Sequence, residues 1–189
     1  AEKGGLDETG PYKVVEGWFK PGIARWNQPV VTVTADNPNR IIIGSADEHA
    51  THPGTMILGA DGVPLKERRG TATTPWPDSE KTHLHQIMVL NGEGKMIEDW
   101  KQWDDLIVFP HTVQFDPYDK DRHLWVVDRT GQQILKFTND GKKLVMRLGE
   151  KDKPGWDATH FNMPSSLTFL PDGSFLVADG YVNGRIAKF

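Results

Sequence analysis

The sequence predicts an all-β protein built from repeated antiparallel four-stranded units, and two observations lead to this prediction. The first is internal repetition: Pro110 aligns with Pro164 at an offset of 54 residues, and Asp128 aligns with Asp179 at an offset of 51. The second is that each copy alternates short apolar runs with Asp, Asn, Gly and Pro, which is typical of strands joined by hairpins. Four antiparallel strands repeated at about fifty residues are the composition of a β-propeller blade.

The two matching copies predict two successive blades. In the first copy, strands are expected at residues 111–115, 124–128, 133–137 and 143–148. In the second copy, they are expected at residues 165–169, 175–179 and 185–189. The second blade therefore lacks its fourth strand and leaves an unpaired edge. The carboxylates of Asp128, Asp140 and Asp179 are expected to accept backbone N–H bonds in these hairpins.

An earlier blade is predicted from residue 29 onward, with inner strands at 29–36 and 40–47. Two pairs of segments compete for its outer strands. One is 55–58 with the turn at Asp61-Gly62, and the other, which we favour, is 86–90 and 96–103 with the turn at Asn91-Gly92. The predicted organisation is a lead-in with an outer strand at 1–28 and a partial propeller at 29–189, carrying an insertion at about 47–82.

Fewer than three complete blades do not close a propeller, which needs at least four and commonly has six. The chain is therefore predicted to be roughly half of a six-bladed ring. The other half is expected from a second polypeptide, a homologous copy or a continuation of the chain. The alternative is an open array with solvent-exposed sheet faces, which the cost of an exposed edge disfavours.

Composition narrows the class of function. The 189 residues carry 22 basic and 26 acidic groups, a net charge of −4, without a cluster of Lys and Arg. Nucleic acid is therefore not expected as a partner. No apolar run approaches the roughly 20 residues that span a bilayer, so no membrane span is expected. An N-terminal Ala without Met is typical of signal-peptide cleavage, which favours a secreted or periplasmic protein.

Several stretches together resemble a known family. These stretches are YKVVEGW, FPH, LWVVDRTGQQILKF, ATHFNMPSSLTF and VADGYVNGRIAKF. They resemble NHL-repeat six-bladed propellers, specifically the peptidyl-α-hydroxyglycine α-amidating lyases and their bacterial relatives. The resemblance covers nearly the whole chain from Tyr12, apart from the insertion. It implies a lyase that releases glyoxylate from a C-terminal α-hydroxyglycine and leaves a peptide amide. It also implies a channel site with zinc held by three histidines, and a structural calcium.

His111 is the first candidate metal ligand. It opens an innermost strand, and innermost strands line the axial channel, so that histidines from several blades can converge on one ion. By resemblance, His111 matches the first zinc ligand of the family, and the other two ligands belong to blades that this chain lacks. The resemblance also makes the carbonyl of Val113 a candidate calcium ligand. The alternative for His111 is a hydrogen-bonded residue at a strand end.

Tyr181 and Arg129 are the candidate catalytic residues. Tyr181 follows Asp179-Gly180 and matches the tyrosine that the family uses as a general base, a role that requires a nearby cation to lower the phenol pKa. The alternative is a tyrosine packed between blades. The family also uses an arginine after the second strand of its first blade, where this sequence has Ala46. Arg129, at the same height in the next blade, is a candidate substitute or else a surface cation.

Other histidines lie outside these motifs. Asp47, Glu48, His49 and His52 form a polar cluster at the head of the insertion, either a metal site or an exposed loop. His83 and His85 share one face of an extended segment, which is either a two-ligand metal site or, as we favour, a solvated strand face. His123 and His160 are interpreted as structural. The sequence thus supports a metal-dependent lyase-like enzyme, with a non-catalytic binding or scaffold propeller as the alternative. A lactonase-like hydrolase is more distant, because it requires acidic metal ligands in the channel.

Overall fold

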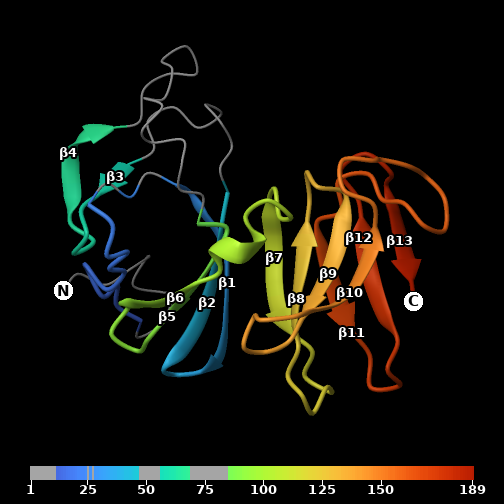
Figure 1. Ribbon diagram of the computed structural model, residues 1–189, viewed down its shortest axis with the longest axis horizontal. Helices are drawn as coiled ribbons and strands as arrows, with labels where there is room; N and C mark the ends of the chain where they lie inside the picture. Colours follow the sequence, from blue (N-terminus) through green and yellow to red (C-terminus); the bar gives the residue numbers. More distant parts are fainter. Residues whose placement is uncertain (1–11, 25, 27, 47–55, 69–84) are drawn as a thin grey trace.

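The computed structural model describes residues 12–24, 26, 28–46, 56–68 and 85–189. In these residues, three antiparallel sheets stand side by side along the long axis of the molecule (Figure 1). The one helical segment among them is η3 (Lys101–Trp103), a single turn of 3-10 helix. The predicted fold class is therefore confirmed: the chain is all-β and has the sheet arrangement of a partial β-propeller.

The first two sheets have four strands each. The first sheet contains β1 (Val30–Asn37), β2 (Arg40–Ser45), β5 (Ile87–Leu90) and β6 (Met96–Asp99), in that spatial order. The second contains β7 (Pro110–Phe115), β8 (Leu124–Asp128), β9 (Gln133–Phe137) and β10 (Leu144–Gly149). Each strand pairs with the next strand of its sheet, so the sheets are meanders in which the first strand is innermost.

The third sheet has three strands, β11 (Ser166–Phe169), β12 (Phe175–Asp179) and β13 (Arg185–Lys188). Phe175 and Phe189 exchange both of their backbone N–H···O bonds, at 3.0 and 2.9 Å. Successive residues of an antiparallel strand direct their backbone N–H and C=O groups alternately toward and away from the neighbouring strand. Because those of Phe189 bond to β12, the N–H groups of Ile186 and Lys188 point away from β12. No described residue pairs with that outer edge.

The described residues of the insertion form a hairpin of β3 (Met56–Leu58) and β4 (Pro64–Arg68), a two-stranded sheet of its own whose Leu58 also bridges to Trp26 of the lead-in. The outer strands of the first sheet are therefore β5 and β6, the pair that the sequence favoured. One boundary was wrong. The fourth strand was expected to run to Trp103, but β6 ends at Asp99 and the chain turns into η3. The turn lets Trp100 and Trp103 both pack on Phe137 of the second sheet, at ring distances of 6.1 and 5.0 Å.

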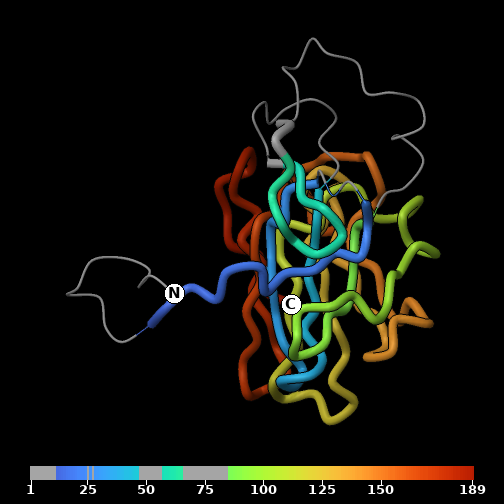
Figure 2. Tube along the Cα trace, turned by 90° about the vertical axis from the view of Figure 1, so that its left-hand side faces the viewer, coloured from blue at the N-terminus to red at the C-terminus, as the bar shows by residue number. Residues whose placement is uncertain are grey.

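An outer strand was predicted within residues 1–28, part of which lies outside the described residues. The described residues of this lead-in form isolated bridges, such as Lys20 to Lys95 and Trp26 to Leu58. Side chains of the lead-in cover the free face of the first sheet, in an apolar cluster with Ile43, Met88 and Leu90. Figure 2 shows the lead-in (blue) and the hairpin (turquoise) lying in front of that sheet. This face is therefore shielded from solvent by the chain itself.

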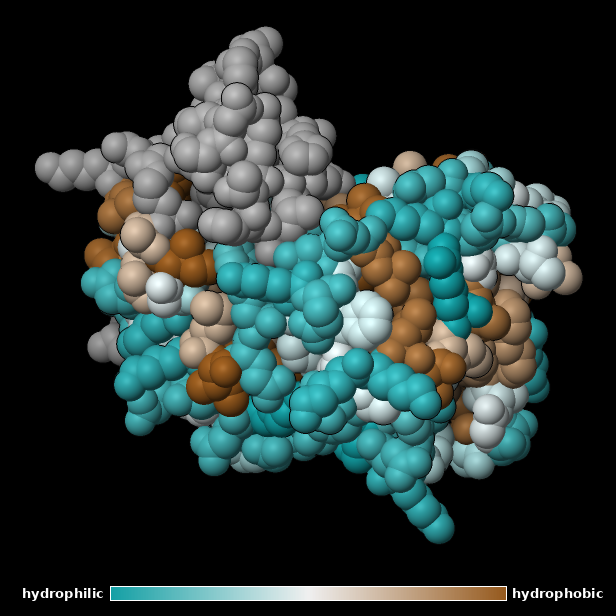
Figure 3. All heavy atoms as spheres, in the orientation of Figure 1, coloured by the Kyte–Doolittle hydropathy of each residue, from teal (hydrophilic) through white to brown (hydrophobic). Residues whose placement is uncertain are grey.

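Two apolar cores join the sheets. Between the first and second sheets, Ile42, Val89 and Leu135 belong to a cluster of fully or nearly buried side chains. Between the second and third, Trp125 packs on Phe169 and Phe175 at ring distances of 5.3 and 4.8 Å. Trp125 and Phe175 therefore pack between the second and third sheets, and Phe137 packs between the first and second. The coloured part of the face drawn in Figure 3 is mostly hydrophilic, with a band of hydrophobic side chains in the half that carries the second and third sheets and smaller hydrophobic patches in the other half.

Hydrogen bonds between innermost strands fix the spacing of the sheets. The N–H of Val113 on β7 donates to the hydroxyl of Thr32 on β1 at 3.1 Å. On the other side, Thr112 and Gln114 donate from β7 to the carbonyls of Ser165 and Leu167, at 2.8 and 2.7 Å. A backbone N–H of β7 thus holds β1, and side chains of β7 hold the segment that contains β11. No helix in the described residues has the length and apolar character needed to cross a membrane.

Gly141 provides a test of the contact between the first two sheets. Its φ is +69°, and an added Cβ would lie 2.2 Å from Cε2 of Trp100. Gly173 has a similar φ of +87°, but an added Cβ there meets nothing within 4 Å. We therefore expect Gly141→Ala to lower the free energy of unfolding by roughly 3 kcal/mol and Gly173→Ala by roughly 1 kcal/mol. Chemical denaturation measures both. Equal losses would contradict the described packing of Trp100 on this turn.

Candidate functional site

A buried carboxylate ends the second strand of the second sheet. Asp128 is 0% exposed and accepts the N–H groups of Val108, Phe109 and Gly131 at 3.1, 2.7 and 3.1 Å. The amide of Gln133 donates to it as well, at 2.8 Å. Burial raises the pKa of Asp128 above its usual value, and these four hydrogen bonds oppose the rise. Asp128 therefore anchors the segment that leads into β7.

Asp179 has the same place in the third sheet and is also 0% exposed. It accepts the N–H of Asn162 at 2.8 Å and the side chains of Asn183 and Arg185 at 2.6 and 2.9 Å. Asn183 in the turn between β12 and β13 and Arg185 at the start of β13 therefore both bind the carboxylate of Asp179. The expectation that Asp128 and Asp179 accept backbone N–H bonds is confirmed, as it is for Asp140, which accepts the N–H of Lys142.

His111 stands at the start of β7 and contacts the third sheet. Its Nδ1 lies 2.7 Å from the carbonyl oxygen of Ser165. A carbonyl only accepts, so Nδ1 carries the proton and Nε2 carries the lone pair. Nε2 lies 3.1 Å from the hydroxyl of Tyr181, and the two ring centroids are 5.6 Å apart. The structure therefore brings together two residues that lie 70 positions apart in the sequence.

A cavity of about 400 Å³ opens between the innermost strands of the second and third sheets. It is lined by His111, Thr112, Ser165, Ser166, Gly180 and Tyr181. Tyr181 is 57% exposed and stands at the rim, where its ring contacts His111 and Arg129 of the second sheet. The N–H of Tyr181 donates to the carbonyl of Met163 at 3.4 Å, which links the turn to the loop before β11.

Arg129 follows β8 and lies between two aromatic rings. Its guanidinium carbon is 4.3 Å from the ring centroid of Phe109 and 5.1 Å from that of Tyr181. The residue is half-buried. Cation–π contacts of this kind hold a guanidinium in place. Three of the four predicted site residues, His111, Tyr181 and Arg129, therefore meet at one end of the second and third sheets.

Val113, the fourth predicted residue, lies two positions further along β7 and does not line the cavity. Its side chain is buried in the core between the first two sheets. Its N–H points away from β8, toward Thr32. The N–H and C=O of one residue in an extended strand face the same side, so its carbonyl faces the inner edge of the sheet. That orientation suits a cation ligand in the channel.

Zinc chemistry can be tested against the donors present. The lone pair of His111 Nε2 faces the cavity and suits a zinc ion, and a phenol oxygen lies beside it. A protein zinc site takes three or four ligands. Among the described residues, His111 is the one histidine that lines this cavity. The donors fit zinc in kind, and a complete site requires further ligands from outside the described residues.

The remaining histidines have other partners or lie outside the described residues. His85 is buried and contacts Asp99 at 2.7 Å, which is a structural pair. His160 contacts Asp157 at 2.9 Å. His83 and the cluster of Asp47, Glu48, His49 and His52 lie outside the described residues.

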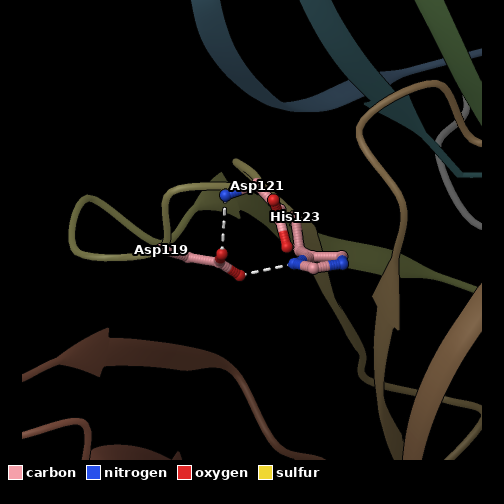
Figure 4. A group of neighbouring side chains, drawn as sticks. All are labelled: Asp119, Asp121 and His123. Carbon is pink, nitrogen blue, oxygen red and sulfur yellow. Dashed lines mark hydrogen bonds and ion pairs between the residues drawn. The ribbon is translucent and has the colours of Figure 1, made fainter.

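One further group could in principle hold an ion. Asp119, Asp121 and His123 lie together in the turn between β7 and β8 (Figure 4). His123 Nδ1 lies 2.5 Å from Oδ2 of Asp119, and the ammonium of Lys136 lies 3.3 Å from the same oxygen. Partial burial raises the pKa of Asp119. Hydrogen bonds from His123, the Asp121 N–H and Lys136 lower the pKa by more than burial raises it, to about 2. This carboxylate already has a cation, so the group is a local ion-pair network.

Sequence reasoning did not identify the carbonyl of Ser165 as the partner of His111, nor Phe109 as the support of Arg129. A signal for the first was available, because Ser165 occupies in its blade the position that His111 occupies in the preceding one. Equivalent positions of adjacent blades are neighbours in a propeller. No comparable signal pointed to Phe109.

Comparison with protein families places an NHL repeat at residues 161–189. A probable peptidyl-α-hydroxyglycine α-amidating lyase of Caenorhabditis elegans is 36% identical over 103 residues, which are 54% of this chain and 28% of the relative. Peptidyl-α-hydroxyglycine α-amidating lyase 1 of Drosophila melanogaster is 36% identical over 99 residues, 51% of this chain and 17% of the relative. Peptidyl-glycine α-amidating monooxygenase B of Xenopus laevis is 35% identical over 170 residues, 89% of this chain and 18% of the relative.

Two solved structures cover most of the chain at low similarity. An auxiliary nutrient binding protein of Bacteroides ovatus has a TM-score of 0.41 and 11% identity, covering 85% of this chain and 46% of that one. A streptogramin B lyase has a TM-score of 0.34 and 14% identity, covering 93% of this chain and 60% of that one. The sequence matches confirm the resemblance to NHL-repeat propellers and to the amidating lyases. The chain spans less than a third of the length of the three curated relatives named above.

Proposed function

We propose that this chain supplies part of the active site of a zinc-dependent, amidating-lyase-like enzyme acting on a peptide that ends in α-hydroxyglycine. The observation that carries the proposal is the contact of His111 Nε2 with the Tyr181 hydroxyl at 3.1 Å, with His111 Nδ1 fixed on the Ser165 carbonyl. The matches to lyases of this class support the same substrate. The cavity beside these residues provides room for a small polar group.

The reaction converts peptidyl-NH–CH(OH)–COO⁻ into a peptide amide and glyoxylate. A base takes the proton of the α-hydroxyl, the oxygen forms a carbonyl with the α-carbon, and the C–N bond breaks with its electron pair moving to nitrogen. The nitrogen then takes up a proton, so the atoms balance. Tyr181 is the proposed base, and its conjugate acid is the source of the proton that the leaving amide requires.

The neighbours of Tyr181 suit this role. The guanidinium carbon of Arg129 lies 5.1 Å from the Tyr181 ring centroid and holds the phenol beside His111. A zinc ion held by His111, when bound, would supply positive charge that polarises the substrate oxygen. The carbonyl of Val113 is the proposed ligand of a structural calcium ion further along β7.

Arg129 is also the proposed partner of the substrate carboxylate. The position after β2, where relatives of this type are expected to carry an arginine, holds Ala46, which is fully buried. The guanidinium of Arg129 enters the same end of the molecule from the adjacent blade, held between Phe109 and Tyr181. A guanidinium binds a carboxylate through two parallel N–H bonds, which orients the reacting carbon.

A non-catalytic propeller that binds a partner at this end is the second candidate. Ala46 in place of an arginine favours it, as does the single histidine among the described cavity residues. The two functions differ in one measurable respect. A binding propeller retains its ligand without releasing glyoxylate.

Glyoxylate release from a short peptide ending in α-hydroxyglycine tests the lyase activity. We expect Tyr181→Phe to lower kcat by a factor of about 10² to 10⁴, because it removes the proposed base and keeps the ring. Tyr118→Phe is the matched control, since Tyr118 is 52% exposed in a remote turn, and its rate should equal that of the unmodified protein. Zinc-loaded assembled protein that releases no glyoxylate, or Tyr181→Phe protein with full activity, would contradict the proposal.

We further propose that additional blades complete the ring on the side of the third sheet, from a second polypeptide, a second copy or a continuation of the chain. That sheet has an unpaired outer edge, and its Ile186 is 67% exposed. An unpaired edge strand is a ready template for another strand.

Native mass spectrometry combined with amide exchange tests this completion. In the assembled protein, we expect a mass above 21.2 kDa and slow exchange of the outward N–H groups of Ile186 and Lys188. The inward N–H of Phe189 is an internal control, because it is bonded to Phe175 in either state. A homogeneous 21.2-kDa species in which both outward groups exchange rapidly would show that the array stays open.

A further inference from the structure

A large apolar side chain is exposed close to the candidate site. Trp156 is 64% exposed and belongs to none of the apolar clusters formed by the described residues. It lies in the loop between β10 and β11, which returns to the end of the molecule that carries Tyr181. Exposing an indole to water is unfavourable by roughly 25 cal/mol per Å² of apolar surface. A fixed exposed tryptophan is therefore more typical of a binding surface than of a packing element.

Hydrogen bonds on both sides of Trp156 fix its backbone. The carbonyl of Gly155 accepts the side-chain amide of Asn183 at 2.8 Å. The carbonyls of Asp157 and His160 accept the guanidinium of Arg185 at 2.9 and 2.7 Å. The loop is thus attached to the turn between β12 and β13, the turn that carries Tyr181.

The indole ring itself is supported from one side. The guanidinium carbon of Arg185 lies 5.3 Å from the ring centroid of Trp156. Arg185 is in turn bonded through Nε to the buried carboxylate of Asp179, at 2.9 Å. The ring is therefore held in a set orientation before any ligand arrives, and an aromatic side chain that is already ordered loses little conformational entropy on binding.

The exposed surface continues from Trp156 to the cavity. Tyr181 and Val182 are each 57% exposed, and Tyr181 lines the cavity. Asn183, which bonds the residue next to Trp156, is two positions from Tyr181. The path from Trp156 to Gly155, across the hydrogen bond to Asn183 and along the chain to Tyr181 places Trp156 on the order of 10 Å from Tyr181. This is the length of about three residues of extended peptide.

We propose that Trp156 is a specificity-determining residue that contacts an aromatic or other large apolar side chain two to four residues before the reacting end of a bound peptide. The inference rests on the proposed function in one respect, that the peptide terminus lies against Tyr181. In this proposal, a chain that leaves the cavity along Tyr181 and Val182 reaches the indole on the face that Arg185 does not cover. Offset or edge-on ring contacts of that kind add affinity beyond the area that they bury.

The test uses seven-residue peptides of Ala and Ser that end in glycine, which lacks the reactive α-hydroxyl. Each peptide carries a single Phe, placed in turn at each position from two to six residues before the C-terminal glycine. Calorimetric titration of the assembled protein should give dissociation constants up to about tenfold lower when Phe lies two to four residues from the end. Trp156→Ala should abolish this dependence on position, and Trp156→Phe should keep it. Val145→Ala, which removes an exposed apolar residue on the outer strand β10, should change nothing.

The outcomes separate this inference from the enzymatic one. If the Phe series shows the expected dependence but reactive peptides release no glyoxylate, the lyase proposal is wrong and the peptide-binding role of Trp156 stands. Equal affinities across the series, the same dependence in Trp156→Ala, or no binding of any peptide would overturn the inference about Trp156. Each of these results is readable without turnover.

Discussion

The carboxylates of Asp128 and Asp179 are the contacts on which the arrangement of the site depends. Asp128 fixes the N–H of Phe109, and the carbonyl of Phe109 accepts the N–H groups of both His111 and Arg129, at 2.8 and 2.9 Å. Asp179 likewise fixes the turn that presents Tyr181. A buried carboxylate without partners costs several kcal/mol, so each of these hydrogen bonds is strongly favoured once the strands have formed. The same interaction therefore stabilises the blade and positions the reactive side chains.

A site that lies between two blades explains why the chemistry requires the propeller. His111 comes from the second sheet, while Tyr181 and the carbonyl that orients His111 come from the third. Their separation depends on the hydrogen bonds and apolar core that join β7 to β11. A change in the angle between the blades would separate Nε2 from the phenol oxygen. The fold thus controls whether His111 and Tyr181 can act on one ligand.

Much of the fold could be predicted because blade strands are specified locally. Alternating apolar residues and Asp-Gly or Asn-Gly turns determine where β5 to β13 begin and end, within one or two residues at most boundaries. The errors arose where long-range packing overrides local pattern. Trp100 and Trp103 continue the pattern of β6, but the chain bends there because both rings pack on Phe137. His111 and Tyr181 followed from motifs, whereas the roles of Phe109 and the Ser165 carbonyl depend on contacts between blades that sequence spacing does not specify.

The central claim is that His111 Nε2 and the Tyr181 hydroxyl face one metal-dependent site. Diffraction at the zinc absorption edge from crystals of the assembled protein grown with zinc tests it most directly. The account predicts an anomalous peak at about 2.0–2.1 Å from His111 Nε2, the usual bond length of zinc to imidazole, with His111 Nδ1 still donating to Ser165. A zinc peak elsewhere, such as at Asp119 and His123, with Nε2 still bonded to Tyr181, would contradict it.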